Sequence, residues 1–148
     1  MTEEKKDFFV SDISLSYQYT AGNATTRFLN KVAEGKLVAQ KCPKCSAVYV
    51  PPRGSCPRCG VATEEELELP DTGAVESFTI VHIPIPGNPI VPPYVSAMIR
   101  LDGADISFLH LIQEIDLADI RIGMRVQALW KDKSDSCTTL ENIKWFNT

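Results

Sequence analysis

Alternating apolar and polar positions near the N-terminus predict an extended segment with one apolar face. The apolar positions are Ile13, Leu15, Tyr17 and Tyr19, and the polar ones are Ser14, Ser16 and Gln18. A segment of this kind either packs on its own domain or docks on a partner, and the pattern leaves both readings open.

The next stretch, residues 23–37 (NATTRFLNKVAEGKL), predicts a short helix. Thr25 or Thr26 would cap its start and Gly35 would end it. Its apolar positions recur at helical spacing, which indicates one face packed on a core. They are Phe28, Leu29, Val32 and Ala33.

From Gly73 onward the pattern changes to short strands. Stretches rich in β-branched and aromatic residues predict five of them. They fall at residues 74–83, 94–103, 104–112, 124–131 and 138–147. Residues 84–93 hold five prolines and predict a loop, since proline cannot donate to a sheet ladder. Residues 63–73 predict an acidic, solvated connector, and residues 113–123 predict a helical turn closed by Gly123.

Five short strands with a helical insert after the third are the order expected of an OB-type barrel, although other small barrels remain possible. We expect a mainly β chain with three parts. Residues 1–36 would form an N-terminal arm and helix, residues 37–70 a metal ribbon, and residues 71–148 the barrel.

Charge is distributed unevenly along the chain. Residues 1–26 carry two basic and four acidic residues, residues 27–58 carry seven and one, and residues 59–148 carry six and fourteen. The net charges are therefore −2, +6 and −8, which sum to the −4 of the whole chain. Basic charge is concentrated around the predicted ribbon, and the predicted barrel is acidic.

Four cysteines, spaced C-x2-C-x10-C-x2-C, predict a metal site. They are Cys42, Cys45, Cys56 and Cys59. Two tight CxxC turns bring four thiolates to one ion and leave no position for water, so the site would be structural. Zinc is favoured, at one ion per chain, and iron in a rubredoxin-like site is the competing reading. Cys137 belongs to no such pattern and is expected to be an ordinary thiol.

Residues for independent catalysis are not evident. The chain has two histidines, His82 and His110, and both lie in predicted strands without an adjacent nucleophile motif. Ribbons and OB barrels often bind nucleic acid, but single-strand binding needs a basic groove with stacking aromatics. A barrel segment of net charge −8 does not fit that requirement.

Several blocks of the chain resemble a family in which a rubredoxin-like zinc ribbon precedes an OB fold, the acyl-CoA-associated family found beside thiolase-like enzymes. They are SYQYTAGNATTRFLNKVAEGKLVAQKCPKC, YVPPRGSCPRCG, ESFTIVHIPIPG, PPYVSAMIRLDGADISFLHLI and IRIGMRVQALW, between Ser16 and Trp130. The resemblance implies a short helix and zinc ribbon followed by a five-stranded OB-fold barrel.

The resemblance also implies a function. Members are typically non-catalytic subunits of heteromeric complexes with thiolases, acyltransferases or thiolase-like aldolases acting on CoA thioesters, and some serve in degradation of aromatic or steroid side chains. A thiolase-like partner would supply the chemistry, with the CoA thioester at or near the interface.

Two groups of residues are candidates for contact with CoA or the partner. Basic residues around the ribbon could meet phosphates or an acidic surface; these are Arg27, Lys31, Lys41, Lys44, Arg53 and Arg58. The stiff apolar loop could form an interface or the rim of an acyl channel; its candidates are His82, Ile85, Pro86, Ile90, Pro92 and Pro93.

The alternatives are a single-stranded nucleic-acid binder and a stand-alone acyl-CoA binding module. No apolar run approaches the roughly 20 residues of a membrane helix, and the N-terminus lacks a signal-peptide pattern. We therefore expect a cytoplasmic protein without nucleic-acid or membrane partners.

Overall fold

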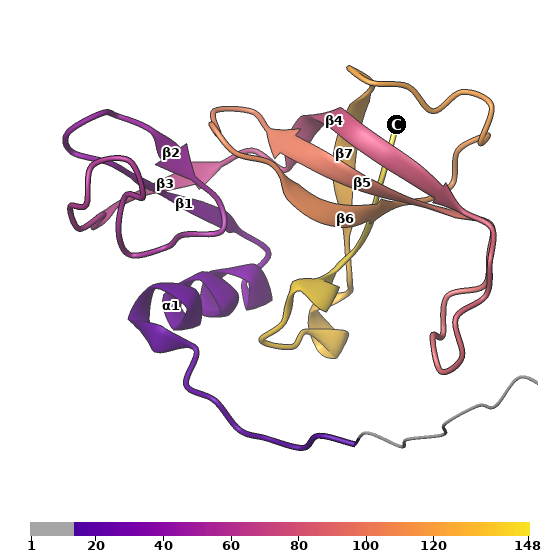
Figure 1. Cartoon of the computed structure of the whole chain (residues 1–148), viewed down its shortest axis with the longest axis horizontal. Coiled ribbons are helices and arrows are strands. Elements are labelled where there is room, and N and C mark those ends of the chain that lie inside the picture. Colours follow the sequence, from indigo (N-terminus) through magenta and orange to yellow (C-terminus); the bar gives the residue numbers. More distant parts are fainter. Residues whose placement is uncertain (1–13) are drawn as a thin grey trace, which may run out of the picture.

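The computed structural model describes residues 14–148, and Figure 1 shows a mainly β chain with the helix α1 near its N-terminal end. Ile13, part of the predicted extended segment, lies outside the described residues. The helix α1 spans Gly22–Ala33 and is followed by β1 (Leu37–Lys41), β2 (Val48–Tyr49) and β3 (Glu65–Leu69). These three strands form an antiparallel sheet in the order β2-β1-β3.

The remaining strands close into a barrel, which confirms the predicted fold class. They are β4 (Thr72–Val81), β5 (Tyr94–Leu101), β6 (Phe108–Ile112), β7 (Arg125–Trp130) and β8 (Ile143–Asn147), with two 3-10 helices, η1 (Lys133–Asp135) and η2 (Leu140–Asn142), between the last two strands. The order around the barrel is β4-β5-β6-β8-β7. Closure depends on a single parallel pair between β6 and β8, Ile112 with Phe146, so these two strands diverge towards η2.

Gly73 allows β4 to approach β5 closely at the start of the barrel. A Cβ atom at this position would lie 2.5 Å from the carbonyl oxygen of Arg100, which is backbone and cannot move aside cheaply. The residue is buried between its two neighbouring strands, because it pairs with Leu101 on β5 and with Val126 on β7. Glycine is therefore required at this strand position for steric reasons.

The helix, the ribbon sheet and the barrel share one hydrophobic core. Phe28 and Val32 from α1 and Leu37 from β1 belong to the same buried cluster as Ile99 and Phe146 of the barrel. Polar contacts connect the parts as well. The backbone N–H of Val48 donates to Asp105 Oδ2 at 2.8 Å, and the N–H of Asp105 donates to the carbonyl of Val48 at 3.0 Å. The three parts are therefore packed as a unit.

Three predictions about local structure need correction. The helix begins at Gly22, and Ala21 precedes it without a side-chain cap, so the predicted capping role of Thr25 or Thr26 is wrong. These threonines lie inside the first turns because the apolar stripe continues far enough towards the N-terminus to place Ala24 and Phe28 on one face. Gly35 has a φ of 79°, and its N–H bonds to the carbonyl of Val32, as expected for a helix end.

The predicted acidic connector contains a strand. Residues Glu65–Leu69 form β3, which pairs along its whole length with β1. Its glutamates stay exposed while Leu67 and Leu69 turn towards the core, so a period of two was present but obscured by the charge. The predicted helical turn at residues 113–123 is wrong: this segment forms only turns and bends before Gly123, whose φ is 83°.

Candidate functional site

Two matching backbone loops bring the four cysteines of the ribbon together. In the first, the N–H of Ser46 donates to the carbonyl of Cys42 at 2.9 Å, and in the second the N–H of Gly60 donates to the carbonyl of Cys56 at 2.9 Å. Ser46 and Gly60 both adopt positive φ, 63° and 67°, which turns each loop back on itself. The four Sγ atoms all lie within 4.8 Å of one another.

Hydrogen bonds from N–H and O–H groups reach two of the four sulfurs, those of Cys42 and Cys56. The backbone N–H groups of Lys44 and Cys45 donate to Cys42 Sγ at 3.4 and 3.5 Å. The buried hydroxyl of Tyr49 lies 3.3 Å from Cys56 Sγ. This contact lowers the pKa of Cys56 to about 6 and raises the pKa of Tyr49 to about 12, since the hydroxyl donates to the charged sulfur.

The donor set fits one structural zinc ion. Four clustered sulfurs, two of them on buried cysteines, supply the closed tetrahedral shell that zinc takes in ribbons, with no position left for water or substrate. The ion would stabilise the fold and take no part in a reaction. Among the described cysteines, Cys137 lies outside this cluster, where its Sγ contacts Thr139 Oγ1 at 3.1 Å.

We expect Tyr49→Phe to weaken zinc binding about 10-fold, because hydrogen bonds that orient metal ligands are typically worth about 10–100-fold in affinity. The substitution removes only the hydroxyl that contacts Cys56 Sγ. Competition with a chromophoric zinc chelator measures the effect. Tyr94→Phe is the matched control, since the Tyr94 hydroxyl contacts Asn88 in the barrel loop. Equal affinities for both variants and the wild type would contradict this role.

The basic candidates surround the ribbon and do not form one site. Arg27 and Lys31 lie on α1, where they pair with Glu66 at 2.9 Å and Glu34 at 2.8 Å. The Lys31–Glu34 hydrogen bond raises the pKa of Lys31 and lowers that of Glu34. The other four candidates have no ion pair within residues 14–148. Lys41 ends β1, Lys44 and Arg58 lie in the two cysteine loops, and Arg53 lies between β2 and the second loop.

The apolar candidates lie in the loop between β4 and β5, residues 82–93, which we call the proline loop. Its apolar side chains face water: Ile83 is 77% exposed, Ile85 57% and Val91 81%. The side chain of Asn88 stabilises the conformation of the proline loop through two hydrogen bonds. Asn88 Oδ1 accepts the N–H of Ile90 at 3.0 Å, and Asn88 Nδ2 donates to the Tyr94 hydroxyl at 3.3 Å. Of the other candidates in this loop, Ile90 and Pro92 are half-buried, and His82, Pro86 and Pro93 are exposed.

The two groups of candidates lie far apart. Figure 1 shows the ribbon at one end of the long axis of the molecule and the proline loop at the other, with the barrel between them. No single ligand-sized site includes both groups. A binding surface that used all twelve residues would have to run the length of the chain.

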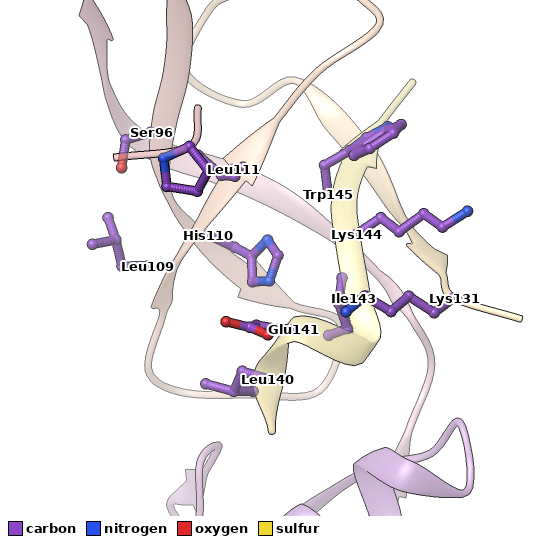
Figure 2. Close-up of a pocket in the computed structure, with 11 residues that line it drawn as sticks. Ser96, Leu109, His110, Leu111, Lys131, Leu140, Glu141, Ile143, Lys144 and Trp145 are labelled. Carbon is purple, nitrogen blue, oxygen red and sulfur yellow. The ribbon is translucent and has the colours of Figure 1, made fainter. Parts of the chain in front are cut away.

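The structure contains a groove that the sequence did not predict (Figure 2). It has a volume of about 610 Å³ and lies over the divergence of β6 and β8. Its lining comes from Pro89 in the proline loop, from strands β5, β6 and β8, and from the segment that leads from β7 to β8. The lining residues are Pro89, Ser96, Leu109, His110, Leu111, Lys131, Leu140, Glu141, Ile143, Lys144 and Trp145.

Two polar atoms of groove residues are buried without a partner among the described residues. They are His110 Nδ1 and Trp145 Nε1. The His110 ring packs edge-on against Phe146, with ring centroids 5.5 Å apart, and Figure 2 shows it between β6 and η2. Burial lowers the pKa of His110, so the imidazole is neutral at pH 7. The walls of the groove are mainly apolar, which suits an apolar group.

No nucleophile motif lies beside His110 in the sequence, and Trp145, Lys131 and Lys144 are not among the candidates predicted from it. The signal that could have found the groove is weak. In the predicted strand SFLHLI, the residues on either side of His110 are leucines, and Leu109 is 62% exposed on the outer face of the barrel. An exposed apolar residue on a strand can indicate a binding surface, but the sequence does not show which side chains of the strand face solvent.

The described residues include no helix that is long and apolar enough to cross a membrane.

Comparisons with known proteins agree with this architecture. Residues 30–65 match the family described as "ChsH2, rubredoxin-like zinc ribbon domain", and residues 66–131 match "ChsH2, C-terminal OB-fold domain". A "DUF35 domain-containing scaffold protein" of Methanocaldococcus jannaschii is 36% identical over 97 residues, which cover 64% of this chain and 67% of that protein.

A second relative is longer than this chain. A protein of Thermomonospora curvata named "Probable enoyl-CoA hydratase alpha subunit" is 32% identical over 103 residues, which cover 70% of this chain and 32% of that protein. The chain thus spans about a third of this relative.

Two solved structures have the same fold. A DUF35-family protein of unknown function from Sulfolobus solfataricus superposes with a TM-score of 0.62 at 28% identity, covering 73% of this chain and 78% of that one. A chain of the "Ltp2-ChsH2(DUF35) aldolase" also gives 0.62 at 28% identity, covering 78% of this chain and 90% of that one.

Proposed function

The chain belongs to the ChsH2-type DUF35 family, in which a rubredoxin-like zinc ribbon precedes an OB fold, and on this premise we propose that it is a non-catalytic accessory subunit of a thiolase-like complex. The complex would act on acyl-CoA thioesters by making or breaking carbon–carbon bonds, in a thiolytic, condensing or retro-aldol reaction. The relatives support this through their names: one is a scaffold protein, and another is part of an aldolase with a second protein.

The observation that carries the proposal is the exposed proline loop beside the groove. Ile83, Ile85 and Val91 project from a loop that Asn88 holds in place, and Pro89 of the same loop lines the groove. An ordered, exposed apolar surface of this kind is typical of a protein interface. With a partner seated on the loop, the groove would accommodate part of an acyl group at the entrance of the partner's active site.

The chain's own chemistry supports a non-catalytic role. The metal shell is closed, and within residues 14–148 no hydrogen bond joins His110 or His82 to a serine, cysteine or lysine side chain. A thiolase-like partner would therefore supply the nucleophile and the acid–base groups. The exposed basic residues of the ribbon, Lys44, Arg53 and Arg58, are available for an acidic partner surface or for CoA phosphates.

Co-expression with the neighbouring thiolase-like gene product tests the proposal. We expect the two chains to co-elute in size exclusion and the double variant Ile85→Asp, Val91→Asp to weaken the association at least about 10-fold, because charge in an apolar interface centre removes an anchor and buries an unpaired carboxylate. The control is Ile122→Asp, which places one such carboxylate at an exposed isoleucine, 69% exposed, outside the loop.

Two results would contradict this function. Failure of the wild-type chain to co-elute, together with salt-sensitive binding of single-stranded DNA or RNA, would favour a nucleic-acid binder. Calorimetric binding of a CoA ester by the isolated chain, without any association with the thiolase-like protein, would instead favour a stand-alone acyl-CoA module.

A further inference from the structure

The chain that leads into α1 carries exposed apolar side chains and packs on nothing in the described part of the molecule. Figure 1 shows residues 14–20, which we call the arm, running away from α1 and clear of both sheets. Leu15 is 81% exposed, Tyr17 77% and Tyr19 80%. Of the two readings that the sequence left open, the structure does not place the arm on its own domain.

The arm has the pattern of a strand that lacks its sheet. Leu15, Tyr17 and Tyr19 alternate with Ser14, Ser16 and Gln18, so that an extended backbone places the three apolar side chains on one face. The rings of Tyr17 and Tyr19 already lie on the same side, with centroids 6.3 Å apart. The polar residues would occupy the opposite face.

The composition of the arm is unlike that of a solvated tail. No charged residue occurs from Ser14 to Thr26, although 23% of the whole chain is charged. Solvated, disordered tails are typically rich in charge and proline and poor in aromatic residues. Exposed strands are normally protected from pairing by lysine, proline or bulges. The arm contains neither lysine nor proline. We therefore expect the apolar face of the arm to pack against another protein surface.

A second copy of this chain offers no suitable sheet edge among the described residues. The barrel strands close on themselves except where β6 and β8 diverge beyond the pair Ile112–Phe146, and there the His110 ring lies between β6 and η2 (Figure 2). In the ribbon sheet, the edge strand β2 has only two residues, and the other edge strand, β3, presents exposed glutamates. Two arms paired with each other would form an isolated two-stranded ribbon, which is marginal in water. The surface that packs against the arm therefore belongs to a different protein.

We propose that the arm is a docking strand, which adds in extended form to an uncharged sheet edge on the catalytic partner and seats Leu15, Tyr17 and Tyr19 in apolar pockets beside that edge. Backbone hydrogen bonds supply affinity in this mode of recognition, and alternate side chains supply register and specificity. The inference rests on the proposed function for the identity of the partner. It adds a second contact, separate from the proline loop, at the end of the molecule where α1 begins.

Two triple variants with opposite faces changed test the docking strand. In the first, Leu15→Ser, Tyr17→Ser and Tyr19→Ser remove the apolar face; in the second, Ser14→Ala, Ser16→Ala and Gln18→Ala change the polar face at the same number of positions. Both are made in the full chain and co-expressed with the thiolase-like subunit. Because these side chains contact nothing in the described fold, zinc content and thermal midpoint should stay at wild-type values.

We expect the apolar-face variant to bind the catalytic subunit about 100-fold more weakly than wild type and the polar-face variant to bind within about threefold, since loss of one anchor typically costs about tenfold and losses of neighbouring anchors do not add fully. In the wild-type complex, hydrogen exchange at the amides of residues 14–20 should slow relative to the isolated chain.

The outcomes separate this inference from the proposed function. Wild-type binding that both variants retain equally, or that both lose equally, would overturn the docking strand and leave the accessory role standing. No binding by the wild type would overturn both. A wild-type chain that dimerises alone, and that becomes monomeric in the apolar-face variant, would overturn the choice of partner in favour of self-pairing.

Discussion

Replacing Cys56 by serine is expected to abolish stoichiometric zinc binding and to unfold the ribbon. Cys56 is 1% exposed, and its sulfur is one of the four clustered sulfurs. The same sulfur also contacts the hydroxyl of Tyr49. Structural zinc supplies an apparent free energy of about 10–16 kcal/mol in small zinc modules, as much as the entire stability of about 5–15 kcal/mol of a typical domain. The two loops that carry the cysteines contain little other buried apolar surface, so they cannot fold without the ion.

The loss should extend beyond the ribbon. Val48 and Val50, which flank the cluster, belong to the same core as barrel residues Ile99 and Phe146. We therefore expect the variant to lose the single cooperative thermal transition of the wild type and to melt at lower temperature throughout. Elemental analysis should give about one zinc per wild-type chain and close to none for the variant, and circular dichroism should follow the unfolding.

Cys137→Ser is the matched control. Cys137 is the fifth cysteine and lies outside the cluster, so its loss should leave the zinc content at about one per chain. A wild-type thermal transition in Cys56→Ser would contradict a folding role for the ion. Iron–thiolate absorption in freshly purified wild-type protein would contradict the identity of the metal and leave its structural role intact.

Replacing Asn142 by alanine is expected to destabilise the fold by about 3 kcal/mol, because the carbonyl and N–H of Cys137 lose their partner and the carbonyl of Val32 loses one of its two hydrogen bonds. Asn142 is 3% exposed. Its Nδ2 donates to the carbonyl of Val32 at 3.1 Å and to the carbonyl of Cys137 at 2.6 Å, and its Oδ1 accepts the N–H of Cys137 at 2.8 Å. One side chain thus connects the end of α1 to the segment between β7 and β8.

Urea unfolding measures this change in the free energy of unfolding. Asn147→Ala is the control, since Asn147 Nδ2 reaches Glu114 at 3.2 Å in an exposed contact, and its loss should cost less than about 1 kcal/mol. Equal destabilisation by the two substitutions would contradict the special role of Asn142. Because the same segment carries Leu140 and Glu141 into the groove, the Asn142 variant should also disorder that wall of the groove.

Local patterns in the sequence were sufficient for much of the fold. Alternation and β-branched residues predicted the barrel strands, and proline excluded residues 84–93 from the sheet. Two local predictions failed. Glutamates concealed the strand Glu65–Leu69, and the helical turn predicted at residues 113–123 is absent, since this segment has only turns and bends. In both places the tertiary environment decided, because pairing with β1 or packing against the barrel outweighs local propensity.

The four metal ligands could be predicted because all the required information lies within a short stretch of sequence. The CxxC spacing sets the reach of two thiolates from one turn, and Gly60 supplies the left-handed residue after the second pair. The groove had no such signal. Its walls come from Pro89, Leu109, Leu140 and Trp145, which are brought together only when β6 and β8 diverge on closing the barrel.

The sequence by itself therefore determined the metal site, the order of the barrel strands and the position of the proline loop outside the sheet, since each depends on neighbours close along the chain. Only the tertiary structure decided that the basic residues and the proline loop lie at opposite ends, that a groove opens between β6 and β8, and that the arm packs on no described part of its own chain. These are properties of surfaces, and a surface is assembled from segments whose relative positions are fixed by long-range pairing and a shared core rather than by local pattern.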